Sequence, residues 1–149
     1  MARHLTDLRV ARVGLLLLGG LYLLGGVAAV SGFFQLRAGP ADLAAWFAAN
    51  GTPPSGILIA GVLYGAIGLA GIAAARVLRK RNTPGYLLAG VFVALVAFDF
   101  LGDLVLRRTS GPDREDFLAT TLTGGIWLVT TVCLARTRLQ RESDLSSGQ

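Results

Sequence analysis

The chain has 149 residues, of which 53% are hydrophobic and 15% are charged, and 20 of them are glycine. The apolar residues form long uninterrupted blocks, which excludes an ordinary soluble domain and indicates a membrane protein. The net charge of +5 does not indicate a nucleic-acid partner, because the basic residues gather at the ends of the apolar blocks and leave no basic face.

Four apolar blocks have about the 20 residues that a helix needs to cross a bilayer. They cover residues about 10–36, 55–78, 85–106 and 117–134. Blocks of this kind form helices, because a transmembrane barrel needs alternating segments of about ten residues. The predicted fold class is therefore all-α: a single transmembrane domain over residues 1–149, built as a bundle of four membrane-spanning helices. The first block exceeds the signal-peptide core of about 7 to 15 residues, so we expect it to be retained.

The basic residues predict the orientation of the bundle. Ten of them lie in the N-terminal tail, in the second connection and after the fourth block, whereas four lie on the opposite side. The positive-inside rule then places both termini in the cytoplasm. The abundance of arginine, alanine and glycine points to a bacterial chain, so the predicted location is the bacterial cytoplasmic (inner) membrane.

The first connection carries an amphipathic segment over residues about 41–50. Leu43 and Phe47 are four residues apart, and Asn50 with Gly51 provides a helix stop. Trp46 has the kind of ring that settles at a lipid headgroup boundary. We expect a short interfacial helix here, with Trp46 as its anchor; a lid over the mouth of the bundle is the alternative interpretation.

Glycines mark the faces through which the first two blocks pack. In the second block Gly61 and Gly65 form a GxxxG pattern that Gly68 extends, and in the first block Gly19 and Gly26 share a stripe. Small residues let helix backbones approach closely in lipid, where helix association has no hydrophobic driving force. This pattern fits either packing within the bundle or a seam between two chains.

The second connection, RKRNTPGY, is short, so the blocks on either side of it are predicted to be antiparallel neighbours. Thr83 is the expected helix cap, with Pro84 in the first helical position. After the fourth block, the polar segment at about 140–149 is expected to be disordered.

Two carboxylates, Asp99 and Asp103, interrupt the third block four residues apart. Asp103 has Arg107 as its i+4 neighbour and is interpreted as a surface pair. Asp99 lies deeper, where a carboxyl group is either protonated or faces water or a bound cation. Depth counting at about 1.5 Å per residue places it level with polar residues of other blocks. The predicted intramembrane polar cluster consists of Asp99, Tyr22, Tyr64, Thr120 and Thr123.

We expect neither a cofactor nor a metal, and no catalytic residue is assigned. The single histidine, His4, lies in the tail, and the single cysteine, Cys133, has no partner for a disulfide. HExxH, GxSxG and Asp-rich motifs are absent from the sequence.

The layout resembles the small bacterial four-helix membrane proteins grouped around the DoxX-like families. A basic N-terminus leads to LLLLGGLYLLGG, an outer amphipathic segment follows, and the hairpin RKRNTPG precedes the last two blocks. The second block, ILIAGVLYGAIGLAGIAAA, lacks an acidic residue that a DoxX protein would carry there. Such families share hydropathy more than motifs, so the resemblance implies a fold and no residue role.

Three functions stay open at this point. The first is a non-enzymatic membrane protein that serves as an accessory or assembly partner of a larger membrane complex. The second is a small proton- or cation-coupled transporter or channel that works as a homodimer through Asp99. The third is a membrane enzyme acting on a lipid or isoprenoid substrate, with Asp99 and a tyrosine moving a proton. The expected partners are the lipid bilayer and a second copy or a larger complex, with no nucleic acid.

Overall fold

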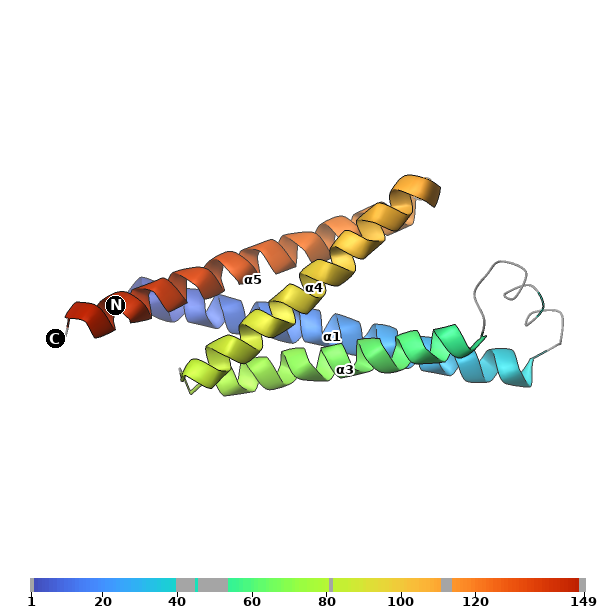
Figure 1. Ribbon diagram of the computed structural model, residues 1–149, viewed down its shortest axis with the longest axis horizontal. Coiled ribbons are helices and arrows are strands. Elements are labelled where there is room, and N and C mark those ends of the chain that lie inside the picture. The colour runs from blue at the N-terminus through green and yellow to red at the C-terminus, as the bar shows by residue number, and fades with distance from the viewer. Residues whose placement is uncertain (1, 40–44, 46–53, 81, 111–113, 148–149) are drawn as a thin grey trace. The chain divides into compact units, whose positions relative to one another are not determined.

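The computed structural model describes residues 2–39, 45, 54–80, 82–110 and 114–147. Over these residues the regular structure is helical and consists of four long helices (Figure 1). They are α1 (Ala2–Ala38), α3 (Pro54–Leu78), α4 (Thr83–Ser110) and α5 (Arg114–Ser147). The predicted all-helical chain with four long helices is confirmed over the described part of the chain.

Three of these helices are long and apolar enough to cross a membrane. The qualifying segments are Thr6–Ala38 of α1, Ser55–Leu78 of α3 and Thr83–Gly102 of α4, with mean hydropathies of 2.2, 2.2 and 2.0. They overlap the first three predicted spans. Helix α5 includes the fourth predicted span, 117–134, whose membrane crossing stays a prediction.

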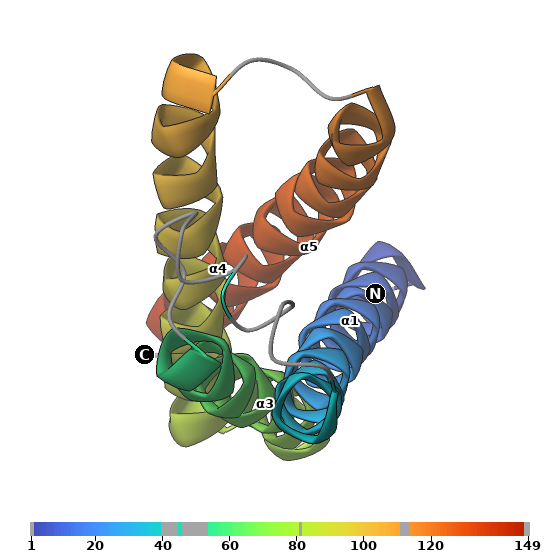
Figure 2. The same cartoon turned by 90° about the vertical axis from the view of Figure 1, so that its right-hand side faces the viewer.

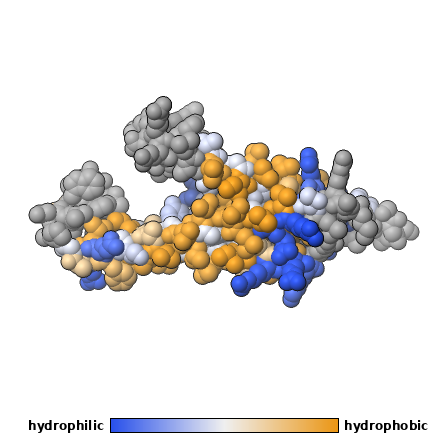
Figure 3. Space-filling view, turned by 180° about the vertical axis from the view of Figure 1, so that it is seen from behind, coloured by the Kyte–Doolittle hydropathy of each residue, from blue (hydrophilic) through white to orange (hydrophobic). Residues whose placement is uncertain are grey.

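Much of the apolar surface of these helices faces outward. In the three spans only 28%, 22% and 33% of the most apolar window is buried. Leu24, Ile59 and Leu87 are among the large side chains that are more than half exposed. On the face drawn in Figure 3, hydrophobic residues make up most of the coloured surface and hydrophilic ones gather in patches. A bilayer is the solvent that such a surface fits.

The turn before α4 is capped one residue earlier than the sequence predicts. The side-chain Oδ1 of Asn82 accepts a hydrogen bond from the backbone N–H of Gly85 at 3.1 Å. Asn82 is therefore the cap, Thr83 begins the helix and Pro84 takes its second position. Both asparagine and threonine are good caps, so local propensity did not separate them.

The last helix is longer than its predicted span. Helix α5 continues to Ser147, where the sequence led us to expect disorder from about residue 140. An ion pair between Arg138 Nε and Glu142 Oε1, at 3.0 Å, links residues four apart along this extension. Such pairs support a helix whose surface is polar.

The chain forms two compact units. One consists of Met1–Leu18 and Ala70–Gln149 and is called the core unit; the other, Gly19–Leu69, is called the glycine unit. Each unit has its own mode of packing, which is described separately below.

The core unit packs through interlocking side chains. Leu15, Leu18 and Leu78 are fully buried and Phe92 is 1% exposed. Side-chain hydrogen bonds to backbone join its helices: Arg12 Nε donates to the backbone carbonyl of Ala75 at 3.2 Å, and Trp127 Nε1 donates to that of Val93 at 2.9 Å. The core unit therefore combines an apolar interior with ties from polar side chains to backbone.

The glycine unit packs backbone against backbone. Among its described residues the buried ones are all glycines: Gly19, Gly26, Gly61 and Gly68. A Cβ atom added to Gly26 would lie 2.5 Å from the backbone nitrogen of Gly65 and 2.7 Å from the carbonyl oxygen of Gly61. Figure 2 shows these parts of α1 and α3 side by side.

The other end of this contact uses the second pair of glycines. A Cβ atom on Gly68 would lie 2.5 Å from the nitrogen of Leu23 and 2.7 Å from the carbonyl oxygen of Gly19. Gly65 differs, because its own Cβ direction is open and only its backbone is approached. The glycines predicted for helix packing thus lie at a close approach of α1 and α3 within one chain.

Candidate functional site

Asp99 extends the buried stripe of α4. Ala89, Phe92 and Val96 recur at helical spacing and are almost fully buried, and Asp99 follows three residues later, half-buried. Its neighbours Phe98 and Leu101 are 79% and 58% exposed on the other side of the helix. Asp99 therefore lies on the packing face of α4, at the point where that face becomes less covered.

Helix α5 lies against this part of α4. A Cβ atom on Gly124 would come within 3.2 Å of the ring of Phe100. Phe100 and Gly124 are the chain neighbours of Asp99 and Thr123, so these segments lie at one level of the α4–α5 pair. Thr120 and Thr123 are both half-buried, like Asp99. In Figure 2 the ribbons of α4 and α5 diverge toward the C-terminal end of α4 and the N-terminal end of α5.

Three threonines farther along α5 use their hydroxyl groups within their own helix. Thr130 Oγ1 donates to the carbonyl of Ile126 at 2.6 Å, and Thr131 Oγ1 donates to that of Trp127 at 2.8 Å. Thr137 donates in the same way to Leu134 at 2.9 Å. Hydroxyls satisfied in this way behave as small packing groups. The side of Thr130 is in fact covered by α1, because a Cβ atom on Gly14 would collide with its Oγ1.

The two tyrosines of the predicted cluster meet each other in the glycine unit. Their rings are edge to face, with centroids 5.6 Å apart and an interplanar angle of 69°. Both side chains are half-buried. The structure thus brings Tyr22 to Tyr64 in one unit and the Asp99 segment to the Thr120–Thr123 segment in the other. The joining of these two groups into one site stays a prediction.

Two further predictions fall where the structure gives no side-chain description. Trp46 and the interfacial helix at 41–50 lie outside the described residues, apart from Ala45. The side chain of Asp103 is also outside the described part, although its backbone belongs to α4. The anchor and the Asp103–Arg107 pair remain predictions.

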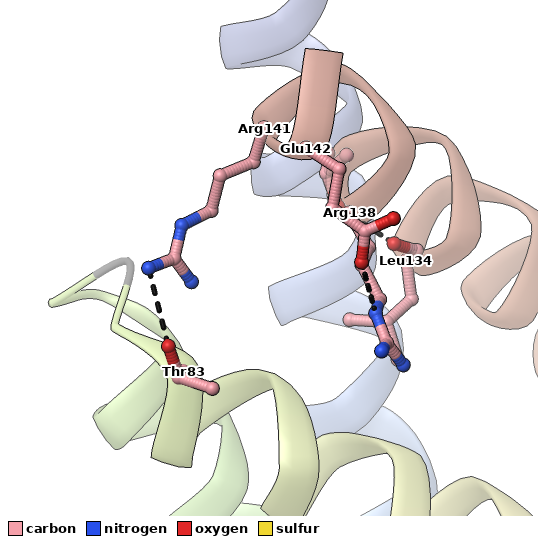
Figure 4. Close-up of polar contacts among 6 residues, drawn as sticks. Thr83, Leu134, Arg138, Arg141 and Glu142 are labelled. Atoms are coloured by element: carbon pink, nitrogen blue, oxygen red, sulfur yellow. Dashed lines mark hydrogen bonds and ion pairs between the residues drawn. The ribbon is translucent and has the colours of Figure 1, made fainter. Parts of the chain in front are cut away.

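The sequence did not reveal a polar cluster at the end of the core unit where α5 finishes. Arg141 Nη2 donates to Thr83 Oγ1 at 3.2 Å (Figure 4). Its guanidinium also lies 5.7 Å from the ring centroid of Tyr86. Arg138 and Glu142 form their ion pair nearby. The arginines of the last helix predicted the orientation of the chain in the membrane, but they did not predict these contacts.

These contacts and the bond from Arg12 to Ala75 bring three basic segments to one end of the core unit. The segments are the start of α1, the connection between α3 and α4, and the C-terminal part of α5. The same three segments carry the basic residues that the sequence assigned to the cytoplasmic side.

The described residues hold no group of three or more histidine, cysteine, aspartate or glutamate side chains that would bind a metal. What the α4–α5 pair offers is one half-buried carboxyl group and half-buried hydroxyl-bearing side chains on a helix interface. A carboxyl group in such a place hydrogen-bonds a neighbouring helix, or exchanges a proton or cation if water reaches it.

No family model matches the chain, and neither the characterised proteins nor the solved structures that were searched include a match. The likeness to the DoxX-like families therefore stays one of layout.

Proposed function

We propose that this chain is a non-enzymatic integral membrane protein that acts as an accessory or assembly partner of a membrane complex. The observation that carries the proposal is the position of Asp99. It continues the buried stripe of α4 to a level where the helix pair is only half covered. A polar side chain placed on a packing face in lipid is a ready tie to another helix.

The glycine contacts support this assignment of surfaces. Gly26, Gly61 and Gly68 are already covered within the chain, so the α1–α3 contact is used for the protein's own fold. At the Asp99 end of the α4–α5 pair, a further helix from a partner would complete a half-covered packing face that carries a carboxyl group. The predicted cluster residues Thr120 and Thr123, which are half-buried in the same unit as Asp99, would then share this tie.

We also infer that both termini face the cytoplasm of a bacterial inner membrane. The convergence of three basic segments at one end of the core unit supports this orientation, because basic residues favour the cytoplasmic side. Reporter fusions at each terminus test it: activity of a cytoplasm-dependent reporter at both ends is expected. Activity of a periplasm-dependent reporter fused to either terminus would contradict the orientation.

The test of the partner proposal uses affinity purification in a mild detergent with measurement of total mass. Wild type and Asp99→Asn, which keeps hydrogen bonding, are expected to purify with further subunits. Asp99→Leu is expected to lose most of them. Phe98→Leu is the matched control, because Phe98 lies one residue away and is 79% exposed, and it should keep the partner.

Transport is the alternative that the same residue supports, since a half-buried acid can also face water. An infrared carboxyl band assigned through Asp99→Asn separates the two functions in reconstituted protein. A band that titrates between about pH 5 and 8 and responds to an ion gradient, in a chain that purifies without other subunits, would replace the assembly proposal with transport.

A further inference from the structure

The core unit has an open groove on its surface between α1 and α5, and Asp99 is not among the residues that line it. Its volume is about 510 Å³, within the range of about 300 to 1,000 Å³ that small-molecule sites have. Val10, Val13 and Leu17 line it from α1, and Leu122, Ile126 and Val129 line it from α5. The walls are therefore those of a site for an apolar chain.

Arg9, Thr121 and Thr130 are the residues with polar side chains in the groove lining. Thr130 lines the groove, but its hydroxyl donates to the carbonyl of Ile126 at 2.6 Å. Arg9 is the charged residue in the lining, and its side chain is exposed. Asp7, two residues earlier, is not part of the lining. The groove thus has an apolar body and a cationic end.

The length of the groove matches one leaflet. Arg9 lies three residues into the α1 span, which begins at Thr6. From Arg9 to Leu17, eight residues later, α1 rises about 12 Å. Half of a hydrocarbon core of about 30 Å is about 15 Å. A molecule seated here would have its head at the membrane boundary and its tail among the hydrocarbon chains.

We propose that this groove binds an anionic phospholipid of the bilayer, with one acyl chain along α1 and α5 and the phosphate paired with Arg9. The apolar side chains that line the groove from both helices select the acyl chain. The guanidinium of Arg9 selects the anionic headgroup through charge-assisted hydrogen bonds to phosphate oxygens. The site lies in the core unit and does not depend on the proposed assembly role.

Gly125 gives a way to fill the groove without disturbing the fold. It lines the groove, and a Cβ atom added to it meets no other atom within 4 Å. A leucine at this position therefore extends into the space that the acyl chain would occupy. Gly20 offers a matched control, because its Cβ direction is also open and it does not line the groove.

The experiment is native mass spectrometry of the full chain released from vesicles of phosphatidylglycerol and phosphatidylcholine. Wild type is expected to retain one phosphatidylglycerol per chain in preference to phosphatidylcholine. Arg9→Gln should lower this preference roughly fivefold, the factor that one basic residue contributes near an anionic headgroup. Gly125→Leu should lower retention of both lipids, whereas Gly20→Leu should behave as wild type. Arg79→Gln should also behave as wild type, because Arg79 is an exposed arginine that does not line the groove.

Three results would overturn the proposal. Equal retention of the two lipids, unchanged by Arg9→Gln, would show that no headgroup is recognised at the cationic end. Unchanged retention in Gly125→Leu would show that the bound lipid lies elsewhere. The wild-type chain could also carry no lipid and instead bind a second copy or another protein. If Gly125→Leu released that protein, the groove would be a site for a helix instead.

Discussion

The core unit and the glycine unit pack their helices together in different ways. In the core unit large side chains fill the interior, with Phe92, Leu15 and Leu78 at 0% or 1% exposure. In the glycine unit the described buried residues are glycines, and the backbones of α1 and α3 come together directly. In lipid neither unit gains from the hydrophobic effect, so both depend on close atomic contact. The difference lies in which changes each unit tolerates.

The largest effect is expected from adding one methyl group to the glycine unit. Gly26→Ala or Gly68→Ala forces a Cβ atom to 2.5 Å from backbone nitrogen, and backbone cannot move aside as a side chain does. We expect each to lower the free energy of unfolding by about 2 to 3 kcal/mol. Unfolding in mixed micelles with increasing dodecyl sulfate measures this loss.

Gly65→Ala is the control for that prediction. The Cβ direction of Gly65 is open, although it belongs to the same GxxxG pattern. A change within about 0.5 kcal/mol of wild type is expected, as at ordinary surface positions. Equal losses for Gly65→Ala and Gly26→Ala would show that the two helices do not meet as described.

A slightly smaller effect is expected from removing a large side chain in the core unit. Phe92→Ala removes the dispersion contacts of a buried ring. In lipid the free energy of moving the ring out of water does not contribute to the loss. We expect a loss of about 2 kcal/mol, below the usual range of about 3 to 5 kcal/mol for such a change in a water-soluble core. Phe98→Ala, at an exposed position, should change little; similar losses at both positions would contradict the assignment of the core.

The tie between α4 and α5 sharpens the comparison further. Trp127→Phe keeps an aromatic ring but removes the N–H that donates to the carbonyl of Val93 at 2.9 Å. A net loss of about 1 kcal/mol is expected, because the carbonyl of Val93 keeps its place in the α4 helix. Unfolding in mixed micelles with increasing dodecyl sulfate measures this loss. No measurable loss of stability would mean that packing alone joins these helices.

The smallest effect is expected at the polar end of α5. Glu142→Gln removes the ion pair with Arg138. The side chain of Glu142 is 57% exposed and that of Arg138 is 64% exposed. Exposed pairs of this type contribute about 0 to 0.5 kcal/mol, so thermal unfolding should be unchanged within error. A larger loss would show that this end is buried in the assembled protein.

The sequence predicted the helices better than their contacts. Continuous apolar blocks and the short RKRNTPGY connection were sufficient for four long helices, because hydrogen bonding in lipid leaves few other choices. The glycine pattern indicated packing faces on the first two blocks and left open whether these faces pack within the bundle or at a seam between two chains. It did not show that Gly26 and Gly68 would be the crowded positions while Gly65 is open, because this depends on the rotation of each helix about its axis.

The polar contacts were harder to foresee. Depth counting placed Asp99 level with Thr120 and Thr123, and the Phe100–Gly124 contact joins their segments. The same counting could not identify which residue of another helix each side chain meets. The bond from Trp127 to Val93 and the contact of Arg141 with Tyr86 depend on side-chain reach across helices, which a single sequence does not encode in its periodicity.

The central claim is that the α1–α3 glycine contact belongs to one chain and leaves the Asp99 end of α4–α5 for a partner. Disulfide formation tests it most directly. A Cβ atom on Gly61 would lie 3.1 Å from that of Ala29, close to the separation of about 3.5 to 4.5 Å in disulfides. The background is Cys133→Ser, which removes the single native cysteine.

We would express Ala29→Cys and Gly61→Cys together in one chain and, separately, as two singly substituted chains in the same cells. A disulfide inside the doubly substituted chain, with no linked dimer from the two single variants, is the predicted result. A linked dimer formed between the two singly substituted chains would place the glycine contact at a seam between two copies and contradict the claim.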